Sequence, residues 1–275
     1  MSTVTASSRR EHRVTARSLA RCKRRGEPFS MLTAYDFAFS RIFDQAGIDV
    51  LLVGDSMGNV VQGMETTLPV TLDEVVYHSR MVVRGASRAL VVGDMPFGSY
   101  QVSPEDAVRS AIRLVKEGGV HSVKLEGGRT MSATIERIVA AEIPVMGHVG
   151  LTPQAIHRMG GYRVQGRGEA SRQRVIEDAR AVEAAGAFSI VLEGVPADLA
   201  GEITGLLSIP TIGIGAGPDC DGQVLVMHDL LGLNDWTPSF VKQYANLGSL
   251  ASQAARRFAE EVTNRKFPDE EHSYR

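Results

Sequence analysis

The 275-residue sequence predicts an α/β fold in which eight parallel strands close into a (β/α)8 TIM barrel. Three observations lead to this fold. Eight short aliphatic, β-branched runs alternate with helical segments, the joints are short, and the runs are apolar almost throughout. Such runs are typical of strands covered on both faces, and strand–helix–strand order favours parallel pairing with right-handed crossovers. Eight such units in about 250 residues match a closed barrel.

A basic segment precedes the first strand. Eight Lys and Arg residues lie between positions 9 and 25, and we expect a solvated arm followed by a first helix. An organelle transit peptide is also Arg-rich and Ser-rich, but Glu11 and the direct run into the first strand oppose it. Nucleic-acid binding is disfavoured because no aromatic residues interleave with the basic ones for base stacking.

Strands and helices follow in alternation. Two helices carry clear start signals: Thr71 with Glu74 three residues later forms a capping box, and Ser103 precedes Pro104 at the first helical position. Gly118 is expected to end the second of these helices. The expected strands are 29–36, 49–55, 89–95, 121–127, 144–150, 188–194, 210–217 and 222–229.

The domain organisation is simple. After residue 235 the pattern predicts one or two helices and a polar end. We expect residues 1–27 to form the arm and helix, and residues 28–275 a single catalytic barrel with a C-terminal helical extension. A doubly wound open sheet is the alternative, but no Gly-rich phosphate-binding motif follows the first strand.

Composition excludes several classes of protein. Hydrophobic residues make up 43% of the chain, charged residues 23%, and the net charge of −2 gives no reason to expect nucleic acid or an anionic membrane as partner. Cys22 and Cys220 are too few for a disulfide framework. No apolar run reaches the roughly 18 residues of a membrane-spanning helix. We therefore expect a soluble, cytoplasmic protein.

Ionisable residues mark the ends of five consecutive strands, where barrels of this kind place their active sites. By strand alternation, Asp55 shares a face with Val53 and Leu51, and we expect the faces that carry these residues to point into the barrel. Lys124 lies two residues before Glu126, which ends one of these strands. The five residues are Asp55, Asp94, Glu126, His148 and Glu193.

Each position alone has an ordinary structural explanation. An Asp at a strand end commonly caps a helix or turn, His148 could be a hydrogen-bonded core histidine, and Lys124 with Glu126 could be a salt bridge at the rim. Five coincident positions favour a site, because like charges gathered out of water repel unless a cation or substrate compensates them.

The residue types indicate the chemistry. Oxygen ligands without cysteine select a hard divalent cation, Mg²⁺ before Mn²⁺, and Asp55, Asp94 and Glu126 are the predicted ligands. Such a cation polarises the ketone of a chelating α-keto acid, so that a neighbouring proton becomes removable. The predicted reaction class is enolisation of an α-keto acid followed by making or breaking of a carbon–carbon bond.

Further residues complete this hypothesis. Glu193 is the remaining carboxylate and the predicted base. Lys124 supplies a positive charge for an oxyanion, and Ser56 offers a hydroxyl and a backbone N–H to a substrate carboxylate. His148 could orient either the substrate or a second reactant, and its spacing does not decide between them.

Long segments in order along the chain carry a resemblance to a known family. They include "LLVGDSMGNVVQGMETTLPVTLDEVVYHSRMVVRG", "VVGDMPFGSYQ", "VKLEGG", "VMGHVGLTPQ", "VLEGVP" and "IPTIGIGAGPDCDGQVLVMHDLLG". Over about residues 28–240 the chain resembles the ketopantoate hydroxymethyltransferase family. That family transfers a one-carbon unit from 5,10-methylenetetrahydrofolate to 3-methyl-2-oxobutanoate, and its members are Mg²⁺-dependent barrels that are commonly decamers.

The resemblance implies roles for the same residues. Asp55, Asp94 and Glu126 would form the Mg²⁺ site, and Glu193 would be the proton acceptor. The keto acid would contact Asp55 with Ser56, Asp94 and Lys124. The folate contacts stay unassigned, and a homodecamer is the expected assembly.

Three rival interpretations remain. A Mg²⁺-dependent carbon–carbon lyase or mutase of the isocitrate lyase or phosphonopyruvate type often has a lid cysteine, and neither Cys22 nor Cys220 follows strand 4 or 5. A Schiff base on Lys124 is disfavoured by its carboxylate neighbours, which keep the amine protonated. A barrel that only binds a metabolite would leave the acidic cluster without a purpose.

Overall fold

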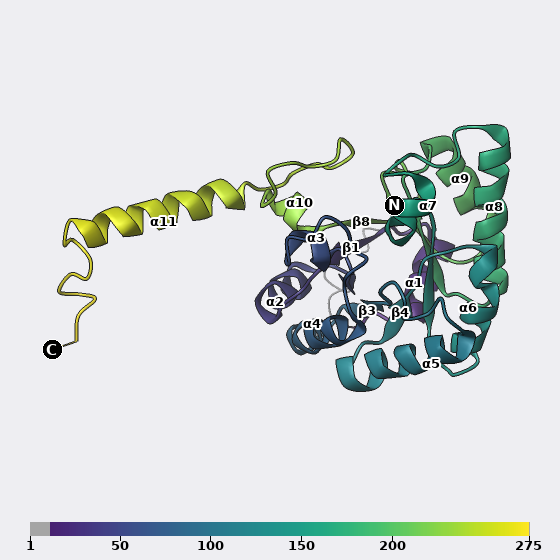
Figure 1. The fold of residues 1–275 in the computed structure, drawn as a ribbon, viewed down its shortest axis with the longest axis horizontal. Helices are drawn as coiled ribbons and strands as arrows, with labels where there is room; N and C mark the ends of the chain where they lie inside the picture. The colour runs from purple at the N-terminus through teal and green to yellow at the C-terminus, as the bar shows by residue number, and fades with distance from the viewer. Residues whose placement is uncertain (1–11, 275) are drawn as a thin grey trace, which may run out of the picture. The chain divides into compact units, whose positions relative to one another are not determined.

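The computed structural model describes residues 12–274 and divides the chain into two compact units, Met1–Val226 and Met227–Arg275. The first unit contains a closed barrel of eight parallel strands in sequential order, which confirms the predicted fold class (Figure 1). The strands are β1 (Phe29–Thr33), β2 (Val50–Val53), β3 (Leu90–Asp94), β4 (Ser122–Lys124), β5 (Val145–Gly150), β6 (Ser189–Glu193), β7 (Thr211–Ile214) and β8 (Gly222–Leu225).

Strand pairing fixes which residues stand beside one another at the barrel rim. Each strand lies within its predicted range but is shorter. In the ladder between β3 and β4, Asp94 is the partner of Lys124, and between β5 and β6, Gly150 is the partner of Glu193. β1 pairs with β8 from Phe29 onward and closes the barrel. The ionisable residues of neighbouring strands are therefore brought to one end of the barrel.

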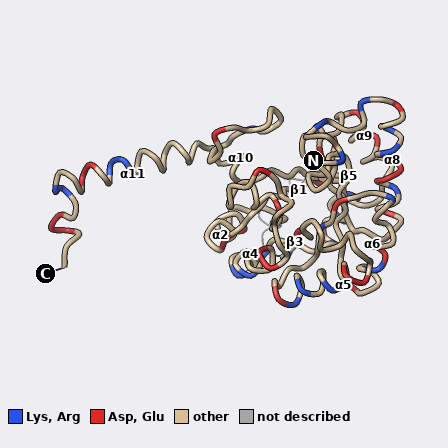
Figure 2. Tube along the Cα trace, viewed as in Figure 1, with Lys and Arg blue, Asp and Glu red and all other residues tan. Residues whose placement is uncertain are grey.

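Helices connect the strands, and Lys, Arg, Asp and Glu are concentrated on outer helices such as α4, α5 and α8 (Figure 2). The helices of this unit are α1 (Ala16–Arg25), α2 (Phe37–Ala46), α3 (Met57–Val60), α4 (Leu72–Gly85), α5 (Pro104–Arg113), α6 (Ser132–Val139), α7 (Ile156–Met159), α8 (Glu169–Ala184) and α9 (Ala197–Leu206). Short turns of helix are η2 (Leu114–Gly118), η3 (Arg129–Met131) and η4 (Pro153–Ala155).

The predicted helix starts are confirmed. Thr71 and Glu74 make both hydrogen bonds of a capping box at the start of α4, and Ser103 accepts from the backbone N–H of Asp106 at the start of α5. The predicted stop at Gly118 is one residue early. The helical path continues from α5 through η2, and Gly119, with φ of 78°, is the residue in the left-handed conformation that ends it.

Apolar side chains fill the barrel interior and continue onto α1. Leu19 of α1 is only 1% exposed and belongs to the interior cluster. Because Phe29, Val50 and Leu90 in this cluster stand at the first positions of their strands, α1 covers the amino end of the barrel. The cluster consists of Val14, Leu19, Phe29, Met31, Val50, Leu52, Leu90, Val92, Met146, Val191, Ile212 and Val224.

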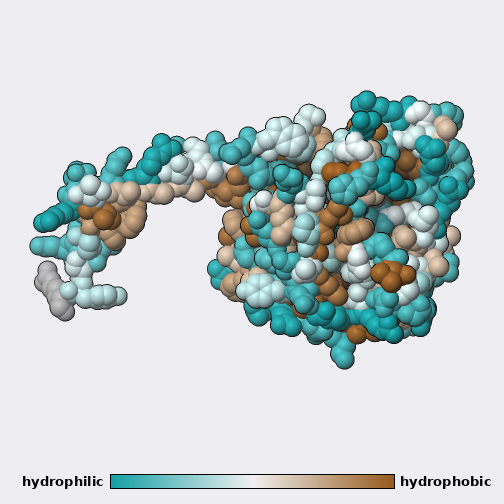
Figure 3. All heavy atoms as spheres, in the orientation of Figure 1, coloured by the Kyte–Doolittle hydropathy of each residue, from teal (hydrophilic) through white to brown (hydrophobic). Residues whose placement is uncertain are grey.

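The predicted first helix is thus present and packed on the barrel, while residues 1–11 of the expected arm lie outside the described residues. In the second unit, α10 (Met227–Leu231) is followed by α11 (Leu247–Thr263), so the tail beyond residue 235 forms one helix. None of the residues of α11 is buried, and Figure 3 shows hydrophobic atoms on the surface of this segment. Between residues 12 and 274, no helix is long and apolar enough to cross a membrane.

Asp44 of α2 holds the loop that leads into β3. Its carboxylate accepts hydrogen bonds from the hydroxyl of Ser87 at 2.7 Å and from the backbone N–H groups of Arg88 at 3.0 Å and Ala89 at 2.7 Å. Burial alone would raise the pKa of Asp44, but these hydrogen bonds outweigh it and leave the pKa below its ordinary value. The ionised form therefore stabilises the fold.

We expect Asp44→Asn to lower the free energy of unfolding by about 2 kcal/mol at pH 7, because an amide N–H₂ would face backbone donors. Since the folded-state pKa is depressed, the stabilisation is present above the unfolded pKa of 3.8 and is lost as pH falls through the folded value. Urea unfolding at pH 7 and pH 3 measures both effects, with exposed Asp219→Asn as control. Equal losses at both pH values would contradict this account.

Candidate active site

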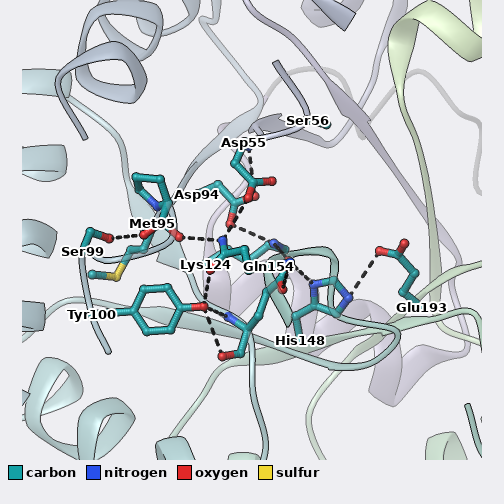
Figure 4. Close-up of polar contacts among 12 residues, drawn as sticks. Asp55, Ser56, Asp94, Met95, Ser99, Tyr100, Lys124, His148, Gln154 and Glu193 are labelled. Carbon is teal, nitrogen blue, oxygen red and sulfur yellow. Dashed lines mark hydrogen bonds and ion pairs between the residues drawn. The ribbon is translucent and has the colours of Figure 1, made fainter. Parts of the chain in front are cut away.

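A buried ion pair joins β3 to β4 at the mouth of the barrel. Lys124 Nζ donates to Asp94 Oδ1 at 2.8 Å, and both side chains are almost completely buried (Figure 4). Burial would lower the pKa of Lys124, but Asp94, Glu126 and Asp55 more than offset it and hold the pKa above its ordinary value. Lys124 is therefore a permanent ammonium in this site.

Asp55 reaches the same place by a different route from the one expected. β2 ends at Val53, and the interior cluster contains Val50 and Leu52 but neither Leu51 nor Val53. The expectation that Asp55 points inward because it shares a face with Leu51 and Val53 is therefore wrong. The chain leaves the strand after Val53, and the turn that follows brings Asp55 to the mouth.

Two carboxylates lie side by side there. The backbone N–H of Asp55 donates to Asp94 Oδ2 at 3.3 Å, and the Asp55 side chain is buried. Burial raises the pKa of Asp55 to about 7; the charge of Asp94 adds to this rise, and Lys124 opposes it. An ionised Asp55 at neutral pH thus costs free energy unless another positive charge is present.

Glu126, His148 and Glu193 extend the cluster around the rim. Glu126 Oε1 lies 4.0 Å from Lys124 Nζ and 3.6 Å from His148 Nδ1. His148 Nε2 lies 3.3 Å from Glu193 Oε2, as Figure 4 shows. Burial raises the pKa of Glu126 well above its ordinary value. The Glu193 side chain is 19% exposed, so it is the carboxylate of this group most open to solvent and substrate.

The structure therefore brings six of the predicted site residues into one connected network: Asp55, Asp94, Lys124, Glu126, His148 and Glu193. Ser56 follows Asp55 directly, and its hydroxyl lies 2.9 Å from the hydroxyl of Tyr35. It is a neighbour of the charged network rather than a member of it.

Two neutral residues, Gln154 and Tyr100, also belong to this network, and the sequence patterns did not predict them. Gln154 Nε2 donates to Asp55 Oδ2 at 3.0 Å, and its backbone N–H donates to Glu126 Oε2 at 3.1 Å. Tyr100 OH lies 2.6 Å from Gln154 Oε1. Both residues stand in segments that carry the family resemblance, "GSYQ" and "LTPQ", and that position after strands 3 and 5 is the signal that could have found them.

The donor set suits a hard divalent cation. When all three are ionised, the carboxylates of Asp55, Asp94 and Glu126 against the ammonium of Lys124 leave two negative charges, which one such ion balances. Among residues 12–274, no three His, Cys, Asp or Glu side chains are arranged to hold a metal by themselves. An ion beside Asp55 and Asp94 would thus complete its octahedron with water or substrate oxygens, as Mg²⁺ commonly does.

Comparison with known proteins gives a consistent result. The family model described as ketopantoate hydroxymethyltransferase matches residues 13–270. A 3-methyl-2-oxobutanoate hydroxymethyltransferase of Pelobacter propionicus is 56% identical over 263 residues, which cover 95% of this chain and 97% of the relative. The enzyme of that name from Streptomyces avermitilis is 58% identical over 262 residues, covering 95% and 91%.

Solved structures resemble the fold at much lower identity. A phosphoenolpyruvate phosphomutase from Streptomyces platensis subsp. rosaceus has a TM-score of 0.61 at 14% identity, covering 90% of this chain and 88% of that one. A phosphonopyruvate hydrolase in complex with oxalate and Mg²⁺ has a TM-score of 0.60 at 12% identity, covering 94% and 93%. At such identities the likeness concerns the fold alone.

The unfavourable ionisation of Asp55 gives a testable stability effect. In metal-free protein at pH 8, we expect Asp55→Asn to raise the free energy of unfolding on the order of 2 kcal/mol. Because the folded pKa is raised, the cost is absent below the unfolded pKa of 3.8 and grows as pH rises towards about 7. The gain should vanish at pH 3, and at pH 8 added Mg²⁺ should stabilise the wild type more than the variant.

Urea unfolding in EDTA and in Mg²⁺ measures this difference, with exposed Asp219→Asn as the control for a lost surface charge. A variant that is less stable than the wild type in EDTA at pH 8 would contradict the analysis of the mouth.

Proposed function

The chain belongs to the ketopantoate hydroxymethyltransferase family, and we propose that it transfers a hydroxymethyl group from 5,10-methylenetetrahydrofolate to 3-methyl-2-oxobutanoate, forming 2-dehydropantoate for pantothenate biosynthesis. The observation that carries this proposal is the buried network at the barrel mouth, in which Asp55, Asp94, Glu126 and Lys124 lie beside the more accessible Glu193. A small, negatively charged keto acid fits such a site only together with a cation.

Asp55, Asp94 and Glu126 are the residues to which we assign Mg²⁺, with Asp55 and Asp94 side by side and Glu126 beyond Lys124. When bound, Mg²⁺ would withdraw electrons from the ketone of the substrate and so acidify the proton on C3. The carboxylates hold the ion, and their own mutual repulsion falls when they do so.

Substrate orientation falls to Lys124 and Ser56. The Lys124 ammonium, fixed by Asp94 at 2.8 Å, offers its charge to the oxygen that becomes negative as the enolate forms. Ser56 offers a hydroxyl, oriented by Tyr35 at 2.9 Å, and a backbone N–H to the substrate carboxylate. Asp55 and Asp94 border the same space.

Glu193 is the base in this proposal. It takes the C3 proton, and the electron pair of the broken C–H bond passes into the enolate, which then bonds to the one-carbon unit. Before that bond forms, water breaks the two C–N bonds that hold the one-carbon unit on the folate, so tetrahydrofolate leaves and the unit carries the water oxygen at the oxidation level of formaldehyde. After the enolate carbon has bonded to this unit, the oxygen takes up a proton and becomes the new hydroxyl. His148 Nε2 lies 3.3 Å from Glu193 Oε2, and we assign His148 the role of orienting this base.

Neither enzyme rival gains support from the site. A lyase or mutase of the isocitrate lyase or phosphonopyruvate type shares the fold with this chain, and the likeness goes no further. A Schiff base needs a neutral amine, but the three surrounding carboxylates hold the pKa of Lys124 above its ordinary value.

Assembly and location belong to the proposal as well. By family resemblance the chain forms a homodecamer in the cytoplasm and binds neither nucleic acid nor membrane. Large exposed apolar side chains on α11 are consistent with self-association: Leu250, Phe258 and Val262.

The experiment is hydrogen–deuterium exchange at C3 of 3-methyl-2-oxobutanoate in D₂O, followed by NMR without folate. We expect exchange with Mg²⁺ and none with EDTA. Because a positioned general base typically contributes 10²–10⁴-fold, Glu193→Gln should slow the exchange at least about 100-fold. Exposed Glu136→Gln on α6 is the matched control and should exchange at the wild-type rate.

Full exchange by Glu193→Gln would remove Glu193 as base while leaving the family intact. Exchange that continues unchanged in EDTA would overturn the metal-dependent mechanism.

A further inference from the structure

Gln154 connects three strand ends. It lies in η4, after β5, and its side-chain Nε2 donates to Asp55 Oδ2 and to the backbone oxygen of Met95, both at 3.0 Å. Its backbone N–H donates to Glu126 Oε2 at 3.1 Å, so one residue touches two of the three proposed cation ligands. Met95 directly follows Asp94, which is the third proposed cation ligand.

Tyr100 fixes which way the Gln154 amide faces. Its hydroxyl lies 2.6 Å from Gln154 Oε1 and 3.2 Å from the backbone N–H of Glu126, which can only donate. The hydroxyl therefore accepts from the Glu126 N–H, and it donates its single proton to Gln154 Oε1 at 2.6 Å in preference to the Glu126 carbonyl oxygen at 3.3 Å. A flipped amide would place its oxygen against Asp55 and the Met95 carbonyl, which are both acceptors, so only one orientation is compatible with the contacts.

Both residues are buried: the exposed fraction is 2% for Tyr100 and 6% for Gln154. A buried amide or hydroxyl costs free energy unless it is hydrogen-bonded. Here the Gln154 amide and the Tyr100 hydroxyl form their hydrogen bonds with each other and with the segments that carry the proposed cation ligands. Water cannot easily replace a missing partner at this depth. The orientation of the two carboxylates thus depends on the Tyr100–Gln154 pair.

The contacts leave one oxygen of each carboxylate free of this pair. On Asp55, Gln154 occupies Oδ2 and leaves Oδ1; on Glu126 it occupies Oε2, while Oε1 faces Lys124 and His148. We propose that Tyr100 and Gln154 act as one positioning unit, which holds the Asp55 and Glu126 carboxylates in the orientation that binds the divalent cation. This inference rests on the proposed function, because it takes that cation site as given.

The test measures cation affinity directly, without keto acid or folate. Mn²⁺ binding to the whole chain is followed by the EPR signal of the free ion, for the wild type, Gln154→Met and Tyr100→Phe. Both substitutions keep the side-chain size and remove only the polar groups. Since loss of a residue that orients a metal ligand typically costs 10–100-fold in affinity, we expect the Mn²⁺ dissociation constant to rise at least 10-fold in Gln154→Met and less in Tyr100→Phe.

A double variant distinguishes one unit from two separate effects. If Tyr100 acts through Gln154, the Gln154→Met/Tyr100→Phe protein should bind Mn²⁺ as Gln154→Met does. Losses that multiply would overturn the single unit. Unchanged affinity in both single variants would overturn the positioning role, and failure of the wild type to bind Mn²⁺ would overturn the proposed function and this inference with it.

Stability is measured separately, because a merely structural role would lower the melting temperature in EDTA without changing the affinity of the folded protein. Exposed Gln173→Met and Tyr77→Phe are matched controls and should bind Mn²⁺ as the wild type does. If Gln154→Met does not fold, Tyr100→Phe carries the test alone, and wild-type affinity in that variant overturns the proposal.

Discussion

The ion pair between Lys124 and Asp94 is the interaction around which the site is built. Strand register places the two residues opposite each other in the β3–β4 ladder, so the pair follows from how the barrel closes. Two further carboxylates at the mouth border this pair, Asp55 through its backbone contact to Asp94 and Glu126 through Lys124, while Glu193 is joined to Glu126 by way of His148. Without the ammonium, three carboxylates would face one another in a buried place.

One ammonium does not compensate three carboxylates. Burial raises the pKa values of Asp55 and Glu126, and the charge of the neighbouring carboxylates raises them further. The apolar interior of the barrel stabilises the folded state, whereas the buried like charges at the mouth destabilise it. Such a compromise is common where a protein must bind a charged ligand, since the same repulsion that weakens the empty site strengthens its attraction for a cation.

The sequence predicted the barrel and the gathering of ionisable residues at its mouth, because both depend on regular patterns. Apolar runs with short joints predict strands, and the ionisable residue at each strand end predicts the rim. The route of Asp55 was missed because strand alternation holds only while the chain remains in the strand, and β2 ends at Val53. Gln154 and Tyr100 carry no charge, and their contacts join residues 99 and 26 positions apart, which no local pattern records.

The covering of the amino end of the barrel by α1 has a kinetic consequence. Within residues 12–274, Leu19 and the packed interior fill that side, so we expect a substrate to reach Glu193 past the carboxyl ends of the strands. A reactant that binds below another in this mouth would therefore have to enter before it and leave after it.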